Sequence, residues 1–150
     1  MKIGIGNDHA GTTLKLEICK HLDEIGVEYV DFGVAPGEAI DYPVAAERVC
    51  RQVVNGNVDR AILICGTGIG ISIAANKIKG IRACACSDSF SAKYTRLHND
   101  ANALCLGGRV VGAGLACELV DLFLNTEFEG GRHQRRVDLI TKLEQEGSCE

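Results

Sequence analysis

No apolar run in this 150-residue chain is long enough to cross a membrane. A transmembrane helix needs about 18 or more consecutive apolar residues, and no run approaches that length. The first segment, MKIGIGNDHAG, also lacks the apolar core of roughly 7 to 15 residues that a secretory signal peptide contains. Together these absences predict a cytoplasmic protein with no membrane partner.

Long basic runs are absent as well, and the formal net charge at pH 7 is -4. A protein whose main partner is nucleic acid or an anionic lipid surface normally concentrates positive charge. We therefore expect no nucleic-acid partner, although local pairs of basic residues can still bind a small anion.

None of the eight cysteines forms a C-x-x-C pair or stands at metal-ligand spacing from a histidine. A disulfide framework or a zinc site is therefore not indicated. Most of these thiols lie inside apolar periodic segments, where a free cysteine acts as a small hydrophobic side chain. This group consists of Cys19, Cys50, Cys84, Cys86, Cys105 and Cys117. We expect them to be reduced core residues, and Cys149 to lie in a loose tail.

Short β-type runs alternate with helical stretches along the chain. Mostly apolar runs, typical of strands covered on both faces, occupy residues 2–6, 28–32, 60–65, 82–86 and 103–107. Helices are predicted between them, and a last helix follows Gly130 and Gly131. This alternation predicts one α/β domain of ordinary size, a doubly wound five-stranded parallel sheet with helices on both faces. We expect the strand order 2-1-3-4-5.

Ligands of such sheets bind beyond the carboxyl ends of the strands, where the strand order reverses. With the expected order, that crevice lies between the first and third strands. It brings together the loops NDHAG (7–11) and CGTGIG (65–70), which are the most chemically distinctive loops of the chain. The sequence therefore predicts a binding site at this edge.

The glycine loop matches none of three common phosphate motifs. It has no G-x-x-x-x-G-K-[ST] spacing, and Ile71 occupies the position where a dinucleotide fingerprint needs glycine. Ile71 also stands where a C-x5-R phosphatase needs arginine. Glycine spacing by itself is a weak signal for any one ligand.

The glycines of this loop still have a physical consequence. Gly66, Gly68 and Gly70 let backbone N–H groups approach a ligand closely, and the next helix directs its positive end to the same place. An oxyanion would bind well there, and a cysteine at such a helix start ionises more readily. Cys65 is thus a candidate proton carrier; alternatively, it fills the last inward position of its strand.

Other polar residues have two interpretations each. His98, followed by Asn99, is a candidate acid and base, or a surface histidine beside a turn. Arg132 and Arg136 are four residues apart on one helix face, which suits a phosphate or simply a solvated basic face. Asp8 and His9 either bind a ligand or form a turn that caps the first helix. Arg135 and His133 are expected to project away from the arginine pair.

In combination, the motifs GNDHAG, DYP, CGTGIGISIAANK, HNDAN, RVVG and GGRHQRRV resemble those of ribose-5-phosphate isomerase type B. The family also includes galactose-6-phosphate and allose-6-phosphate isomerases, and the match runs from Met1 to the last helix. The resemblance implies a Rossmann-like sandwich, a single sugar-phosphate isomerase domain over residues 1–150, and no metal or organic cofactor. It also implies a homodimer, with a tetramer left open, in which the helix at about 131–146 packs on the partner.

By this resemblance, Cys65 is the base that moves a proton between C1 and C2 of the open sugar through a cis-enediolate. Thr67 assists proton movement between the two oxygens, and His98 opens the sugar ring. The backbone N–H groups of Gly66, Gly68 and Gly70 hold the enediolate oxygen. The implied substrate contacts are Asp8 and Asn99 for hydroxyls, Tyr42 as a pocket wall, and His9, Arg109, Arg132 and Arg136 for the phosphate.

Three functions stay open on this basis. The first is interconversion of ribose 5-phosphate and ribulose 5-phosphate. The second is the same chemistry on a hexose 6-phosphate, since pentose and hexose phosphates differ by one carbon. The third is a sugar-phosphate-binding subunit without turnover, which needs the arginine pair but neither Cys65 nor His98.

Overall fold

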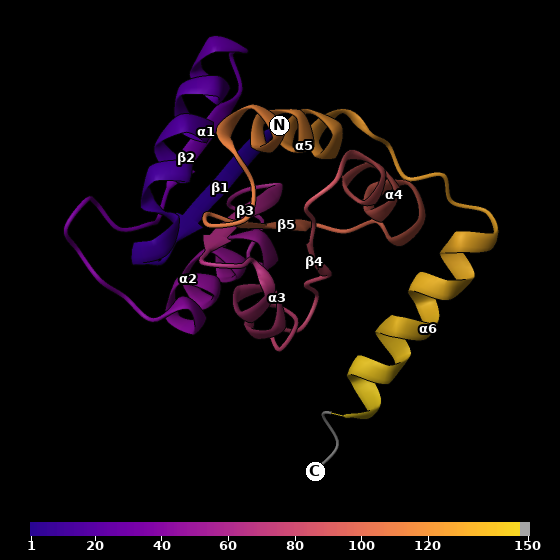
Figure 1. Ribbon diagram of the computed structural model, residues 1–150. Helices are drawn as coiled ribbons and strands as arrows, with labels where there is room; N and C mark the ends of the chain where they lie inside the picture. The colour runs from indigo at the N-terminus through magenta and orange to yellow at the C-terminus, as the bar shows by residue number, and fades with distance from the viewer. Residues whose placement is uncertain (148–150) are drawn as a thin grey trace.

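A computed structural model describes residues 1–147 of the chain, and Cys149 lies outside the described residues. Strands and helices alternate as the sequence predicts (Figure 1). The strands are β1 Lys2–Asn7, β2 Glu28–Asp31, β3 Arg60–Cys65, β4 Ala83–Ala85 and β5 Ala103–Gly107. The helices are α1 Thr12–Glu24, α2 Tyr42–Val54, α3 Ile69–Ala75, α4 Ser89–Asn99, α5 Ala113–Asn125 and α6 Arg132–Glu146, with a short 3-10 turn η1 at His9–Gly11.

The five strands form one parallel sheet, so the α/β doubly wound class is confirmed. The order is β2-β1-β3-β5-β4, and the predicted order 2-1-3-4-5 is wrong in its last two strands. Every residue of β5 is buried, which suits a strand paired on both sides. β4 has three residues and its last, Ala85, is exposed, so it belongs at the edge of the sheet.

Side chains alternate between two cores because successive strand residues point to opposite faces. On one face, Ile62 and Leu104 pack with α1, α4 and α5. On the other face, Leu63 and Cys65 pack with α2 and α3. The alternation therefore directs the Cys65 thiol to the α2 and α3 side of the sheet.

The cysteines of the described chain carry free thiols. Of the six expected in the core, four are buried: Cys19, Cys50, Cys86 and Cys105. Cys84 and Cys117 are half-buried. Burial raises the pKa of the Cys50 and Cys86 thiols to about 12, so these groups stay protonated near neutral pH.

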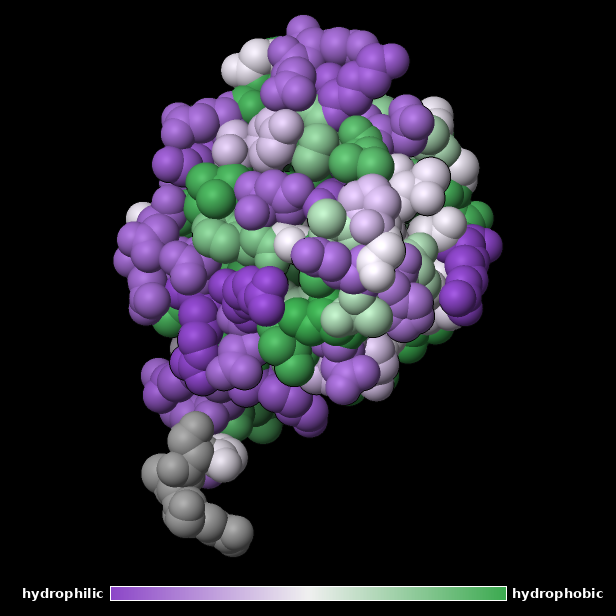
Figure 2. Space-filling model, turned by 90° about the vertical axis from the view of Figure 1, so that its left-hand side faces the viewer, coloured by the Kyte–Doolittle hydropathy of each residue, from purple (hydrophilic) through white to green (hydrophobic). Residues whose placement is uncertain are grey.

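Helix α6 stands beside α4 at one side of the molecule (Figure 1). It buries His133 and Val137, while Ile140 and Leu143 on the same helix are exposed. The side of the molecule opposite α6 mixes apolar patches with polar side chains (Figure 2). Within residues 1–147, no helix combines the length and hydrophobicity that a bilayer span requires.

Candidate active site

Three loops are tied together at the carboxyl edge of the sheet. The Asp8 N–H donates to the Ile64 carbonyl at 3.0 Å, which joins the loop after β1 to β3. The Gly108 N–H donates to the Cys65 carbonyl at 2.8 Å, and the Arg109 N–H to that of Gly66 at 3.1 Å. The predicted proximity of the loops NDHAG (7–11) and CGTGIG (65–70) is confirmed, and the loop after β5 is hydrogen-bonded to the second of them.

Cys65 is 4% exposed, and its Sγ accepts a hydrogen bond from the Gly68 N–H at 3.2 Å. Gly68 has φ 80°, a conformation that glycine adopts without strain. A Cβ there would lie 3.0 Å from the carbonyl carbon of Leu106. The turn that directs an N–H at the thiol therefore requires glycine.

Two side chains flank the glycine loop. The Tyr42 ring, at the start of α2, packs on Gly70, where a Cβ would lie 3.0 Å from the ring. The Arg109 side chain passes Gly66, where a Cβ would lie 3.6 Å from its Nη1. Thr67 is exposed and lines a hollow of about 310 Å³ next to β4 and β5. Both flanking residues are among those singled out from the sequence.

Asp8 caps the 3-10 turn η1 that follows β1, whereas the interpretation that it caps the first helix is wrong, because the N-cap of α1 is Gly11 with no side-chain hydrogen bond. Its Oδ1 accepts hydrogen bonds from the Ala10 N–H at 2.9 Å and the Gly11 N–H at 3.2 Å. His9 is exposed and lines a separate hollow of about 450 Å³ with residues 36–39. The turn therefore directs the two side chains differently.

Two buried polar residues that support these loops were missed by the sequence reasoning. The Asn7 amide donates to the Asp8 carbonyl and to Thr12 Oγ1, and its Oδ1 accepts from the Val34 N–H. Lys15 Nζ donates to Asp31 Oδ2 at 2.7 Å and to the Val34 carbonyl at 3.0 Å. The available signal was Lys15 itself, a charge on the apolar side of α1.

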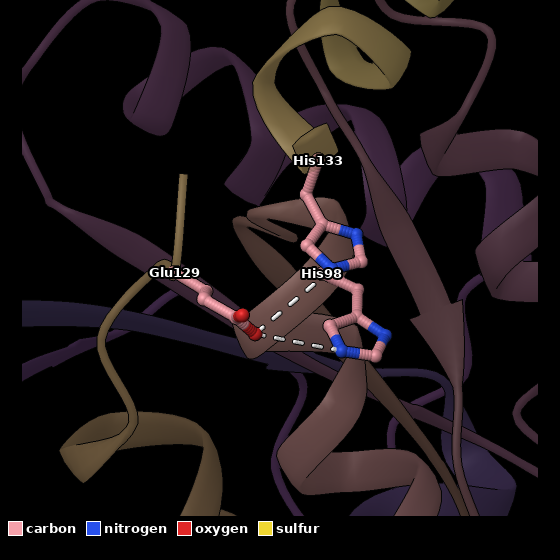
Figure 3. Close-up of side chains that lie close together, drawn as sticks. All are labelled: His98, Glu129 and His133. Atoms are coloured by element: carbon pink, nitrogen blue, oxygen red, sulfur yellow. Dashed lines mark ion pairs between the residues drawn. The ribbon is translucent and has the colours of Figure 1, made fainter. Parts of the chain in front are cut away.

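A second group of polar side chains lies at the end of α4 (Figure 3). The rings of His98 and His133 stack with centroids 3.9 Å apart and an angle of 7°. Glu129 Oε2 lies 3.7 Å from His98 Nε2 and 3.9 Å from His133 Nε2. The expectation that His133 projects away from the arginine pair is wrong, because its ring contacts both Arg132 and Arg136 as it packs on α4.

The arginine pair surrounds the buried imidazole of this group. Arg132 Nε lies 3.3 Å from His133 Nε2, and Arg136 Nη1 lies 3.4 Å from His133 Nδ1. His133 is 2% exposed. Burial lowers the pKa of His133, and His98 and the two arginines lower it further against the opposing effect of Glu129. His133 is therefore neutral at pH 7.

His98, Glu129 and His133 offer three ligand atoms within 4.8 Å of one another. The arrangement does not fit a divalent cation. Tetrahedral zinc needs donor atoms roughly 3.3 Å apart that converge on one point, whereas the Glu129 oxygen lies 3.7 and 3.9 Å from the two histidine nitrogens. His133 Nε2 already lies 3.3 Å from Arg132 Nε. The guanidinium groups of Arg132 and Arg136 also bring positive charge to the same place.

Within one chain the two groups lie apart. Helix α4 begins after the carboxyl end of β4 and leads into the amino end of β5, so His98 lies toward the amino edge of the sheet. Helix α4 itself packs through Ala92 on the face of the sheet opposite to Cys65. One chain thus brings together Asp8, Tyr42, Cys65, Gly66, Thr67, Gly68, Gly70 and Arg109, and separately His98, Asn99, Arg132 and Arg136.

A doubly wound parallel sheet with polar loops beyond the carboxyl ends of its strands defines the Rossmann-like α/β class. A model of the Ribose/Galactose Isomerase family matches residues 3–140, and the chain belongs to this family. It is accordingly an aldose–ketose isomerase, and the resemblance to ribose-5-phosphate isomerase type B is confirmed.

Individual relatives align with this chain over almost its full length. Ribose-5-phosphate isomerase B of Escherichia coli K12 is 55% identical over 144 residues, 96% of this chain and 97% of the relative. Ribose-5-phosphate isomerase B of Clostridium thermocellum, a solved structure, has a TM-score of 0.96 and 52% identity over 98% of this chain and 99% of its own. That of Mycoplasma genitalium, solved with bound ribulose-5-phosphate, has a TM-score of 0.90 and 44% identity over 97% of both chains.

Proposed function

We propose that the chain interconverts ribose 5-phosphate and ribulose 5-phosphate, with Cys65 as the base that transfers the proton between C1 and C2. The observation that carries this proposal is the buried thiol at the end of β3, whose Sγ accepts the Gly68 N–H at 3.2 Å. A relative solved with bound ribulose-5-phosphate supports the choice of a pentose phosphate. A hexose 6-phosphate is the alternative substrate.

In the proposed mechanism, the Cys65 thiolate removes the hydrogen from C2 of the open aldose. The electrons move toward the C1 oxygen, and a cis-enediolate forms. The N–H groups of Gly66 and Gly70 hold the developing oxyanion, because fixed donors stabilise charge without reorganisation. The Gly68 N–H, which donates to Sγ, becomes available to the oxyanion when the sulfur has taken up the proton. Thr67 moves a proton between the two oxygens, and Cys65 returns its proton to C1.

His98 opens the furanose ring before this transfer. The C1–O4 bond breaks, O4 gains a proton and the C1 hydroxyl loses one, so an imidazole can carry out both steps. Asp8 and Asn99 bind sugar hydroxyls, for which the Asp8 Oδ2 is suited because Oδ1 caps the turn. Tyr42 lines the pocket, and the phosphate binds to His9, Arg109, Arg132 and Arg136.

We propose further that the domain of residues 1–150 works as a homodimer and that each site joins Cys65 of one copy to His98 of the other. The separation of these two groups within one chain supports this. Ile69 and Ile73, beside the thiol loop, are each 57% exposed, and Leu143 on α6 is 69% exposed. Between α6 and β4 lies a groove of about 580 Å³. Apolar surface of this kind is typical of an interface.

The test uses a Cys65→Ala variant and the exchange of the C2 hydrogen of ribose 5-phosphate with solvent deuterium. We expect a folded variant in which exchange and turnover are both abolished. Exchange at the wild-type rate would show that Cys65 is not the base. Binding of the sugar phosphate by the wild-type protein without any turnover would instead support a non-catalytic subunit.

The substrate is tested with one purified preparation. Turnover of ribose 5-phosphate, allose 6-phosphate and galactose 6-phosphate is compared under the same conditions. We expect the pentose phosphate to give the highest kcat/KM. A higher value for either hexose phosphate would contradict the assignment.

A further inference from the structure

Glu129 is held close to His98 by the backbone as well as by its side chain. Its N–H donates to the carbonyl of Leu97 at 3.0 Å. The backbone of Glu129 is therefore held beside the residue that precedes His98 on α4. Gly130 and Gly131 then take φ 68° and 54°, values that favour glycine. This turn brings the carboxylate and the first turn of α6 onto the same histidine.

The His98 ring is contacted on two sides by other rings. Tyr94 meets it edge-on with centroids 4.8 Å apart, and His133 stacks on its face at 3.9 Å (Figure 3 shows the histidine pair). His133 is fixed in turn by burial and by its contacts with Arg132 and Arg136. These two ring contacts therefore restrict the plane of the His98 ring, although its side chain is 33% exposed.

The charged and titratable groups around His98 come from several elements. They are Tyr94 on α4, Glu129 before α6, His133 with Arg132 and Arg136 on α6, and Cys84 and Cys86, which line the hollow along α4. In this set, Glu129 supplies the negative charge. Its Oε2 lies 3.7 Å from His98 Nε2, within the range where opposite charges interact.

We propose that Glu129 and His133 are positioning residues of the isomerase, acting through His98. His133 holds the plane of the imidazole, and the Glu129 carboxylate stabilises the imidazolium that forms while His98 carries a proton between O1 and O4 of the sugar. This inference rests on the proposed role of His98 in ring opening. It adds two residues that make no contact with the carbon atoms between which the proton moves.

The two stages of the reaction can be measured separately. Ribulose 5-phosphate cannot close to a furanose because its C5 oxygen carries the phosphate. Exchange of its C1 hydrogen with solvent deuterium therefore reports on Cys65 without ring opening. Net conversion of ribose 5-phosphate needs both stages.

The test compares both rates in wild type, Glu129→Gln and Glu129→Asp. For Glu129→Gln we expect net conversion of ribose 5-phosphate to fall about ten-fold, less than the 10² to 10⁴ that loss of an acid–base group itself causes. Exchange from ribulose 5-phosphate should stay within about two-fold of wild type. Glu129→Asp should recover part of the net rate. Glu127→Gln, the same charge change two residues away on an exposed side chain, is the matched control and should alter neither rate.

His133 is tested with two substitutions. His133→Phe keeps a ring that can stack on His98, whereas His133→Ala removes it. Because His133 also contacts Arg132 and Arg136, each variant is judged by the ratio of net conversion to exchange. We expect this ratio to fall more in the alanine variant than in the phenylalanine variant, and a wild-type ratio in His133→Ala would overturn the role of His133.

If Glu129→Gln lost net conversion and exchange equally, Glu129 would have only a structural role. If net conversion were unchanged, Glu129 would have no role in ring opening. Either result overturns the inference. If the wild-type protein itself gave neither exchange nor conversion, the proposed function would fail. When only the further inference fails, by contrast, the wild type is active and the Glu129→Gln variant does not lose net conversion selectively.

Discussion

The N–H of Gly68 donates to the Sγ of Cys65 at 3.2 Å, and the backbone reaches this geometry through the positive φ of 80° at Gly68. A single turn therefore joins the glycine pattern to the thiol. The same turn starts α3, whose first residue is Ile69.

Gly68→Ala should greatly reduce turnover while the protein remains folded. The positive φ costs a non-glycine residue about 1 to 2 kcal/mol, and the new Cβ would lie 3.0 Å from the Leu106 carbonyl carbon. The loop must shift and withdraw its N–H from Cys65. Gly56→Ala is the control, since Gly56 has φ 73° with no atom within 4 Å of a Cβ. Urea unfolding should give a larger loss of stability for Gly68→Ala, because only this variant adds a clash with the backbone. A similar loss of turnover in both variants would refute the link to the thiol.

Two inactive variants should complement each other if the site is shared between copies. Cys65→Ala and His98→Asn are refolded together, so that about half of the dimers contain one chain of each kind and one intact site out of two. We expect about a quarter of wild-type activity. Cys65→Ala with Thr67→Ala, two lesions in the same half of the site, should give no recovery. Failure of the first pair to recover would mean that the site lies within one chain.

Lys15→Met should destabilise the protein by about 2 kcal/mol. Removing one partner of a buried pair costs about 3 to 5 kcal/mol, and the Asp31 side chain is 38% exposed, which reduces the loss. Lys20→Met removes an exposed ion pair with Glu24 and should change the free energy of unfolding very little. Urea denaturation measures both, and equal effects would contradict the role of the buried ammonium.

The free energy of unfolding should fall below about pH 6.5 partly because of His133. The folded protein lowers the pKa of His133 below its ordinary 6.5, so the unfolded chain binds the proton more readily. The stabilising contribution is complete above the unfolded pKa and is lost as the pH falls through the folded pKa. Urea unfolding of wild type and His133→Gln at about pH 7.5 and about pH 5 checks this. Between the two pH values, the free energy of unfolding should fall less for the variant than for wild type. An equal fall would show that His133 does not contribute to the pH dependence.

The sequence located the loops of the candidate site because their signals are local. An apolar run followed by CGTGIG predicts a strand, a tight turn and a helix start within about ten residues, and the structure has β3, the Gly68 turn and α3 there. Glu129 and His133 carry no such signal. Their contacts with His98 span more than thirty residues and depend on how α4 is oriented and how Gly130 and Gly131 turn the chain.

The sequence by itself determined the alternation of strands and helices, the parallel class of the sheet and the loops at its carboxyl edge, because apolar periodicity and glycine positions act over short distances. Only the tertiary structure decided that β5 rather than β4 pairs with β3 and that α4, the helix carrying His98, packs on the face opposite to Cys65. It also decided that His133 is buried on His98. These features follow from which surfaces of distant segments fit together in space, and periodicity along a single chain does not encode that fit.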